Sequence, residues 1–142
     1  MALFIKLFTR LNIFLVRLTA GRVGGRMGGQ SILLLSTTGR RSGQPRETPL
    51  SYYRDGTRYL VVASNWGQDK FPDWYLNLQR QPRAAMLVDG RRLSVDGRAA
   101  SDDEQARLWP LVTRQNAQFL RYEQQTTRPI RVVILTPLDG AA

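Results

Sequence analysis

The sequence contains no cysteine and no histidine. Without thiols the chain cannot form a disulfide or use a thiolate nucleophile, which is compatible with a reducing compartment. The two absences together exclude zinc sites of the Cys/His type, Ser-His-Asp triads and Cys-His dyads, and we expect no metal site. Catalysis by this chain therefore has to use other side chains or the chemistry of a bound cofactor.

Acidic residues are absent from the first 46 positions, because the first carboxylate of the chain is Glu47. The same segment holds eight basic residues, whereas the rest of the chain holds 13 basic and 11 acidic residues. Most of the net charge of +10 therefore lies in the N-terminal third. Such an excess attracts nucleic acid, anionic lipid or phosphorylated small molecules. Because 19 of the 21 basic residues are arginine, codon bias also explains the scattered ones.

The segment 2–18, "ALFIKLFTRLNIFLVRL", has the spacing of an amphipathic helix. Lys6, Arg10 and Arg17 fall on one narrow face, and the remaining positions are almost wholly apolar. These charges interrupt the apolar run that a membrane-spanning helix needs, and no signal-peptide cleavage site is clear. Two roles stay open, which are peripheral contact with a membrane surface and packing on the rest of the chain or on a partner.

Residues 19–30 contain five glycines and are typical of a flexible connector. The sequence therefore predicts two units, an N-terminal helix with its connector over 1–30 and a folded body over 31–142. The chain has 142 residues, of which 42% are hydrophobic, and this is enough for one globular core.

Short apolar runs between turn residues predict strands in the body. The expected strands span 31–38, 46–55, 57–64, 83–90, 91–100 and 129–137, and the expected helices span 71–82 and 102–125. Ser101 and Glu104 predict a capping box for the second helix, and Pro110 is expected to kink or divide it. About six strands in hairpins with inserted helices indicate an α+β domain built on a small barrel.

Two stretches of the body carry candidate chemistry. The turn "TTGRRSGQPR" at 37–46 brings together glycines, hydroxyls and three arginines. Guanidinium groups bind phosphate or carboxylate in a bidentate manner, and glycine lets backbone N–H groups approach an anion, although such arginines can also be simply solvated. The stretch "ASNWGQDKFPDWYLNLQRQP" at 63–82 runs from a strand end into a helix, a place where ligands often bind. Trp74 and Leu78 of that helix also suit a plain core face.

Taken together, the segments "LLSTTGRRSGQPRETPLSYYRDGTRYLVVASNWG", "PDWYLNLQRQP", "LWPLV" and "TTRPIRVVILTP" closely resemble the deazaflavin-dependent nitroreductase family. The resemblance runs from about residue 12 to residue 137. It implies a six-stranded split β-barrel, related to flavin-binding oxidoreductases, with inserted helices. It also implies reduced coenzyme F420 as the hydride donor, with FMN as a less favoured cofactor.

The resemblance assigns roles to individual positions of this chain. Cofactor-binding positions by resemblance are Ser36, Thr37, Thr38, Arg40, Arg41, Ser42, Gly43, Gln44, Pro45, Ala63, Ser64, Asn65, Trp74, Tyr75 and Asn77. The arginine turn would meet the phosphate and the oligoglutamate tail of the cofactor, and the strand end at 63–65 would lie near the deazaflavin ring. Ser64 and Tyr122 are the candidate catalytic residues, because a hydroxyl or a water has to deliver the proton in a chain without histidine.

The chain departs from the family pattern at two places. The best-known members often place Lys-Gly after the matching serine, where this chain has Asn65 and Trp66. They also shape the substrate pocket with tyrosines, and the matching positions here are Ser51, Asn116, Phe119 and Tyr122. The altered pocket means that turnover of nitroimidazole prodrugs does not follow from the resemblance.

The hypothesis from the sequence is an F420-dependent reductase that passes a hydride to a small lipophilic acceptor, namely a quinone, an enone or a nitro compound. The expected location is cytoplasmic, with a possible place on the inner face of the cell membrane through residues 2–18. The alternative is a non-catalytic binding protein for a lipid, fatty acid, haem or flavin. Nucleic acid is not an expected partner, because no groove-reading module is visible and no aromatics interleave with the basic cluster. The oligomeric state is not predicted.

Overall fold

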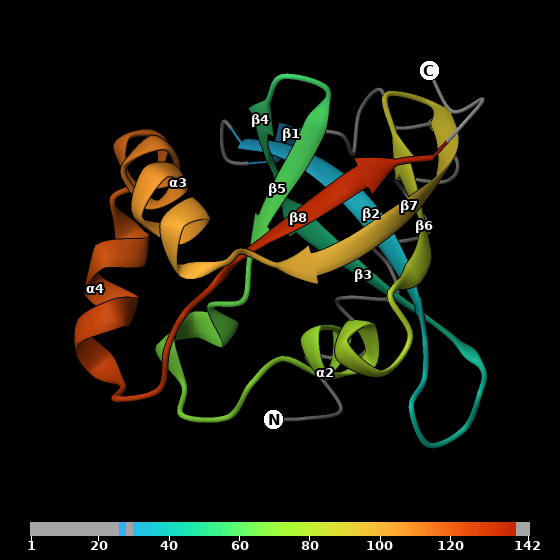
Figure 1. Ribbon diagram of the computed structural model, residues 1–142, viewed down its shortest axis with the longest axis horizontal. Coiled ribbons are helices and arrows are strands. Elements are labelled where there is room, and N and C mark those ends of the chain that lie inside the picture. Colours follow the sequence, from blue (N-terminus) through green and yellow to red (C-terminus); the bar gives the residue numbers. More distant parts are fainter. Residues whose placement is uncertain (1–25, 28–29, 139–142) are drawn as a thin grey trace.

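The computed structural model describes residues 26–27 and 30–138 (Figure 1). The predicted N-terminal helix at 2–18 lies outside the described residues. Within the predicted connector, Arg26 and Met27 form a short strand that pairs with Ser31 and Gln30. The division into two units at residue 30 stays a prediction.

One antiparallel sheet forms the centre of the described residues. Its strands are β1 Arg26–Met27, β2 Gln30–Thr38, β3 Pro45–Ser51, β4 Tyr53–Asp55, β5 Arg58–Val62, β6 Arg83–Val88, β7 Arg91–Ala99 and β8 Val132–Pro137. The number of strands exceeds the predicted six for two reasons. β1 was not expected, and the expected strand at 46–55 is interrupted at Tyr52 to give β3 and β4.

The sheet curls until its two ends meet. Its path runs β1-β2-β6-β7-β8-β5-β4, and β3 pairs with β2. β3 and β4 therefore lie at opposite ends of the hydrogen-bonded order, yet Tyr52 alone joins them in the chain. The backbone N–H of Tyr52 donates to the carbonyl of Ser31 at 3.0 Å and closes this corner. A curled antiparallel sheet of this order is a split β-barrel, as predicted.

Alternation along the strands divides the apolar residues between two cores. On β5 and its end, Tyr59, Val61 and Ala63 enter the core on the inner face, whereas Leu60 and Val62 enter the core on the outer face. Helix α2, Asp73–Arg80, covers the inner core with Trp74, Tyr75 and Leu78. Helices α3, Asp102–Gln115, and α4, Gln118–Gln125, cover the outer core, as Figure 1 shows on the left of the sheet.

The expected long helix at 102–125 is divided, but not at Pro110. Ser101 and Glu104 form the predicted capping box at its start. The helix then continues through Pro110 and ends at Gln115, so the proline does not divide it, and a kink at this position stays a prediction. The chain turns at Asn116, whose backbone is extended and whose side-chain oxygen accepts from the N–H of Gln118 at the start of α4. No helix of the described residues is both long and apolar enough to cross a bilayer.

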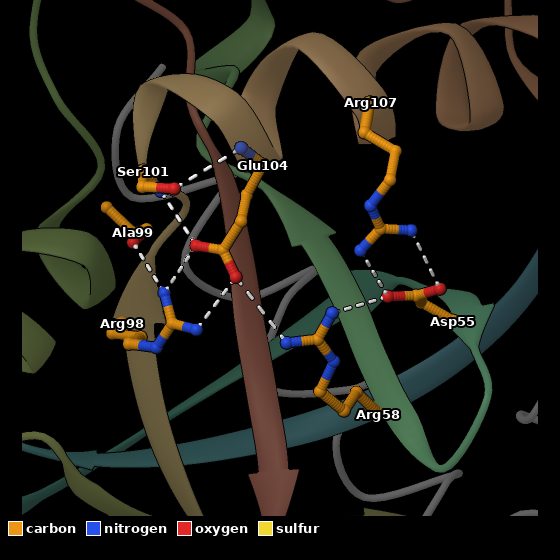
Figure 2. Close-up of polar contacts among 7 residues, drawn as sticks. All are labelled: Asp55, Arg58, Arg98, Ala99, Ser101, Glu104 and Arg107. Carbon is orange, nitrogen blue, oxygen red and sulfur yellow. Dashed lines mark hydrogen bonds and ion pairs between the residues drawn. The ribbon is translucent and has the colours of Figure 1, made fainter.

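Charged side chains tie the start of α3 to the sheet (Figure 2). Glu104 accepts two hydrogen bonds from the guanidinium of Arg98 on β7, at 2.7 and 2.8 Å, and pairs with Arg58 on β5. Asp55 on β4 accepts from Arg58 and from Arg107 on α3. The hydrogen bonds from Arg107 and Arg58 lower the pKa of Asp55 to about 2, and those from Arg98 and Ser101 lower the pKa of Glu104.

Candidate cofactor and acceptor site

The turn between β2 and β3 is held by its own backbone. The N–H of Gly39 donates to the carbonyl of Gln44 at 2.8 Å, and the N–H of Gly43 donates to the carbonyl of Gly39 at 2.8 Å. Gly43 has a φ of +71°, which favours glycine, and a Cβ at Gly39 would lie 2.7 Å from the hydroxyl of Ser42. The guanidinium of Arg46 also donates to that hydroxyl, at 3.2 Å. The glycines thus fix the shape from which the arginines project.

A buried amide joins this turn to α2. Asn77 is 3% exposed, and its side-chain N–H donates to the hydroxyl of Thr37 at 3.1 Å. Its oxygen accepts from the backbone N–H of Arg40 at 3.1 Å and from the guanidinium of Arg40 at 3.0 Å. The same guanidinium donates to Asp73 at 3.2 Å. Arg40 is therefore committed to contacts within the protein, and it orders the wall of the site.

A cleft of about 360 Å³ lies between the turn and α2. Its lining residues are Gly39, Arg40, Arg41, Ser42, Arg46, Glu47, Thr48, Asp73, Trp74 and Asn77. Arg41 is exposed and makes no hydrogen bond or ion pair with any described residue. Three guanidiniums face two carboxylates here, so the cleft carries a net positive charge. Of these three guanidiniums, that of Arg41 alone makes no hydrogen bond or ion pair with a described residue, which suits an anion.

Helical spacing separates the predicted wall residues of α2 into two groups. Trp74 and Asn77 line the cleft. Tyr75 instead stacks on Phe71, with ring centroids 5.4 Å apart, and lines a second cavity with Leu78. The structure therefore brings Trp74 and Asn77, but not Tyr75, to the arginine turn.

The remaining predicted cofactor residues of this region are not among the lining residues of the cleft. Ser36 and Thr38 lie half-buried on β2 and flank the buried Thr37. Gly43, Gln44 and Pro45 are exposed at and beyond the tip of the turn, where their role is to shape it.

The strand end at 63–65 leads into an unusual turn. The short 3-10 helix η1, Asn65–Gly67, has three successive residues in the left-handed region, with φ values of 42° for Asn65, 58° for Trp66 and 75° for Gly67. The side-chain N–H of Asn65 donates to the carbonyl of Lys70 at 2.8 Å. Two of these residues are not glycine, so the turn is strained and needs outside support.

Arg128 supplies that support, although no role was predicted for it from the sequence. Its guanidinium donates to the carbonyls of Ala63 at 3.0 Å and Ser64 at 2.9 Å, and its Nε donates to the carbonyl of Gln68 at 2.8 Å. It also lies over the ring of Phe71, 4.9 Å from the centroid, and burial lowers its pKa. Because these partners lie about 60 positions away in the chain, only the segment "TTRPI" itself could have drawn attention to it.

The turn that follows Ser64 contacts the helix that carries Tyr122. A Cβ at Gly67 would lie 3.1 Å from the Cα of Tyr122 on α4, and the ring of Trp66 lies edge-on to the ring of Tyr122 at 6.4 Å. Ser64 is half-buried, and neither its hydroxyl nor that of Tyr122 has a hydrogen-bond partner among the described residues. Burial raises the pKa of the Tyr122 hydroxyl, which is a hydrogen-bond donor at neutral pH with or without this shift.

Three of the four predicted pocket residues lie on α4 or in the turn just before it. Phe119 packs against Tyr122 at 6.4 Å and against Tyr53 at 6.0 Å, and the amide of Asn116 donates to the hydroxyl of Tyr53 at 3.3 Å. Ser51 ends β3, where it pairs with Ile32, and its hydroxyl makes no hydrogen bond with a described residue.

Helix α2 stands between the arginine turn and the Ser64 turn, as Figure 1 shows at the lower edge of the sheet. A chain of polar contacts runs along it. Asn65 holds the backbone of Lys70, the ammonium of Lys70 lies 4.0 Å from Asp73, and Asp73 pairs with Arg40. This chain of contacts links the cleft to the turn that follows Ser64.

Comparisons with known proteins agree with this geometry. The model of the F420H(2)-dependent quinone reductase family matches residues 8–137. An F420H(2)-dependent quinone reductase of Mycobacterium tuberculosis is 43% identical over 131 residues, which cover 89% of this chain and 88% of the relative. A solved structure of an F420-H2 dependent reductase (FDR-A) is 31% identical with a TM-score of 0.66, covering 73% of this chain and 92% of that chain. A second structure, a domain-swapped dimer, is 29% identical with a TM-score of 0.67, covering 87% and 98%.

These matches confirm the predicted resemblance, the split-barrel fold, the oxidoreductase class and the dependence on coenzyme F420. The matched range includes the arginine turn, the turn at 64–67, Arg128 and both helices of the outer face. The chain belongs to the F420H(2)-dependent quinone reductase family.

Proposed function

We propose that this protein reduces a quinone with F420H2, which it binds by the anionic part in the cleft between the arginine turn and α2. The observation that carries this proposal is the contrast between Arg40 and Arg41. Arg40 is held by Asn77 and Asp73 within the protein, whereas Arg41 is exposed at the cleft without a partner among the described residues. The paired guanidinium of Arg40 therefore shapes the site, and the guanidinium of Arg41 is available to bind the anion of the cofactor.

The residues of the cleft fit the cofactor. Coenzyme F420 carries a phosphate and a tail of glutamates, and guanidinium groups bind both kinds of anion. Arg41 and Arg46 are the two guanidiniums not paired with a carboxylate in the cleft. Trp74 is the aromatic residue among the lining residues of the cleft. FMN offers one phosphate and no carboxylate tail, so this cleft favours the deazaflavin.

When bound, F420H2 supplies a hydride and a proton, and the quinone that accepts them becomes the quinol. The contribution of the chain is to hold donor and acceptor in contact, which in well-aligned cases lowers a barrier by up to about 7–11 kcal/mol. Ser64 and Tyr122 are proposed to donate hydrogen bonds to the acceptor oxygen, where negative charge develops. Support comes from their hydroxyls, neither of which has a hydrogen-bond partner in the part of the chain that the structure describes.

The test is steady-state oxidation of F420H2 with a naphthoquinone, an enone and a nitro compound as acceptors. The proposal predicts turnover with the naphthoquinone, and a loss of roughly tenfold or more in kcat for Ser64→Ala or Tyr122→Phe. Unchanged turnover in both variants would refute the roles of the two hydroxyls. Tight binding of the cofactor without oxidation by any of the acceptors would favour the alternative, a non-catalytic binding protein.

We also propose peripheral membrane contact through residues 2–18, which suits a lipophilic quinone held in a bilayer. The support for this membrane contact comes from the sequence, in which residues 2–18 are largely apolar and carry Lys6, Arg10 and Arg17 on one narrow face. Co-sedimentation of the full chain with anionic phosphatidylglycerol vesicles should exceed that with neutral vesicles and fall for a chain that begins at residue 19. Equal sedimentation of both chains would refute the contact.

A further inference from the structure

Trp66 occupies an unfavourable position in two respects, which are the exposure of its side chain and the conformation of its backbone. Its side chain is 72% exposed, the most exposed of the large hydrophobic residues in the described part of the chain. Its backbone has a φ of 58° and a ψ of 23°, a conformation that a bulky side chain rarely adopts. Neither burial nor local conformation therefore explains a tryptophan here. An observed backbone outlier of this kind points to a role in function.

The turn does not need the indole for its shape. Arg128 holds the carbonyls on both sides of the turn, and Asn65 holds Lys70. Gly67 provides the close approach to α4, where a Cβ would come within 3.1 Å of the backbone of Tyr122. The backbone is thus fixed by other groups, and it presents the indole outward.

The indole is presented beside the candidate acceptor site. Its ring lies edge-on to the ring of Tyr122, with an interplanar angle of 76° and a centroid distance of 6.4 Å. This arrangement leaves much of the indole uncovered, in agreement with its high exposure. Ser64 lies two positions before it in the chain. The indole therefore lies against one of the two candidate catalytic residues and follows the other closely in the chain.

We propose that Trp66 is a specificity-determining residue, on whose open face the planar ring of the quinone stacks before reduction. The inference rests on the proposed quinone reductase function, and it adds the residue that selects fused aromatic acceptors. An electron-rich indole face suits an electron-poor ring, and stacking increases with the size of the ring. The occupant is the acceptor, since the cofactor anion is assigned to the cleft on the other side of α2.

The experiment compares wild type with Trp66→Gly, Trp66→Phe and the control Leu120→Ala, in F420H2 oxidation by 2-methyl-1,4-naphthoquinone and by 1,4-benzoquinone. Leu120 is 43% exposed on α4, about 200° around the helix from Tyr122, so the control removes a second exposed apolar side chain. Trp66→Gly should raise KM for the naphthoquinone roughly three- to tenfold, the effect of one lost aromatic contact. Its KM for benzoquinone should change less. Trp66→Phe and Leu120→Ala should stay within about twofold of wild type.

The Tm separates this role from a structural one. Glycine accepts the left-handed conformation, so Trp66→Gly should keep the Tm of wild type or raise it while KM for the naphthoquinone rises. A fall in Tm together with equal rises in KM for F420H2 and for both quinones would overturn the inference, and so would an unchanged KM in Trp66→Gly. If wild type itself oxidises F420H2 with neither quinone, the proposed function fails first, which is a different result from any of these.

Discussion

The side-chain oxygen of Asn77 accepts two hydrogen bonds from Arg40, one from its backbone N–H at 3.1 Å and one from its guanidinium at 3.0 Å. This contact fastens the arginine turn to α2 across 37 positions of the chain. It also removes Arg40 from the set of cations available to a ligand. The shape of the cleft and the identity of its free cation both depend on this pair.

Replacing Asn77 should therefore damage both stability and cofactor binding. Asn77→Leu leaves the N–H of Arg40 and the hydroxyl of Thr37 without their partner, at a cost of about 2–3 kcal/mol in the free energy of unfolding. Asn77→Asp keeps the acceptor for Arg40 and should recover most of that stability, while its added negative charge weakens F420 binding. Urea unfolding and F420 titration measure the two effects, with Gln79→Leu on the exposed side of α2 as the control. An unfolding free energy within about 0.5 kcal/mol of wild type in Asn77→Leu would contradict this account.

Asp73 should oppose cofactor binding. Its carboxylate pairs with Arg40 at 3.2 Å and lines the cleft, where it repels the anions of F420. Asp73→Asn should therefore lower the Kd for F420 by roughly two- to fivefold at low salt, and the gain should shrink as salt screens the charges. Because Asp73 is 67% exposed, the lost ion pair should cost less than about 1 kcal/mol of stability.

The matched control for that variant is Asp103→Asn, which removes an exposed carboxylate from α3, a helix that contributes no residue to the cleft. Weaker F420 binding in Asp73→Asn would show that Asp73 serves the site mainly by ordering Arg40.

Arg128 should be required for the turn that carries Ser64 and Trp66. Arg128→Met removes hydrogen bonds to the carbonyls of Ala63, Ser64 and Gln68, and we expect a loss of roughly 2–4 kcal/mol in unfolding free energy with a fall in kcat. Arg128→Lys should restore little, because an ammonium cannot reproduce the spread of donors of a guanidinium.

The control for Arg128 is Arg92→Met, which removes an exposed arginine from β7. Unfolding by urea, followed by the intrinsic fluorescence of the tryptophans, of which Trp74 is buried in the folded state, measures the effect. Equal stability of Arg128→Met and Arg92→Met would contradict the role of Arg128.

Stability should fall in acid between about pH 4 and pH 2. Arg107 and Arg58 lower the pKa of Asp55 from 3.8 to about 2, so the folded state binds a proton less readily than the unfolded state. The stabilisation is present above pH 4 and is lost as the pH falls through the folded value. Asp55→Asn should be less stable at pH 7 and should show a flatter dependence over this window. Urea midpoints at constant ionic strength measure it, and parallel pH profiles of wild type and Asp55→Asn would contradict it.

Local sequence patterns predicted those strands and helix ends whose structure depends on neighbouring residues. The short apolar runs at 57–64 and 83–90 predict strands that the structure shows, because a run of apolar residues bounded by turn residues is a property of a few neighbouring positions. The capping box of Ser101 and Glu104 was found for the same reason. The helix is not divided at Pro110, because the buried side chains of Leu108 and Val112 pack on the outer core on either side of the proline.

The features of the site that were not predicted from the sequence depend on contacts between residues far apart in the chain. No local signal distinguishes Arg40 from Arg41, since the difference lies in Asn77 and Asp73 on a helix more than 30 positions later. The support of the strained turn by Arg128 is hidden for the same reason, because its partners are carbonyl groups that every residue carries. Tyr75 lies beside Trp74 in the sequence, but helical geometry turns it to the other cavity.

The most direct test of the account is a fluorescence titration of oxidised F420 into wild type, Arg41→Gln and Arg92→Gln, at low and high salt, with FMN titrated in parallel. The account predicts saturable F420 binding by wild type and Arg92→Gln, at least about tenfold weaker binding by Arg41→Gln, and a smaller difference at high salt. FMN should bind more weakly than F420. Equal F420 affinity in Arg41→Gln and wild type would contradict the assignment of the cofactor anion to the cleft.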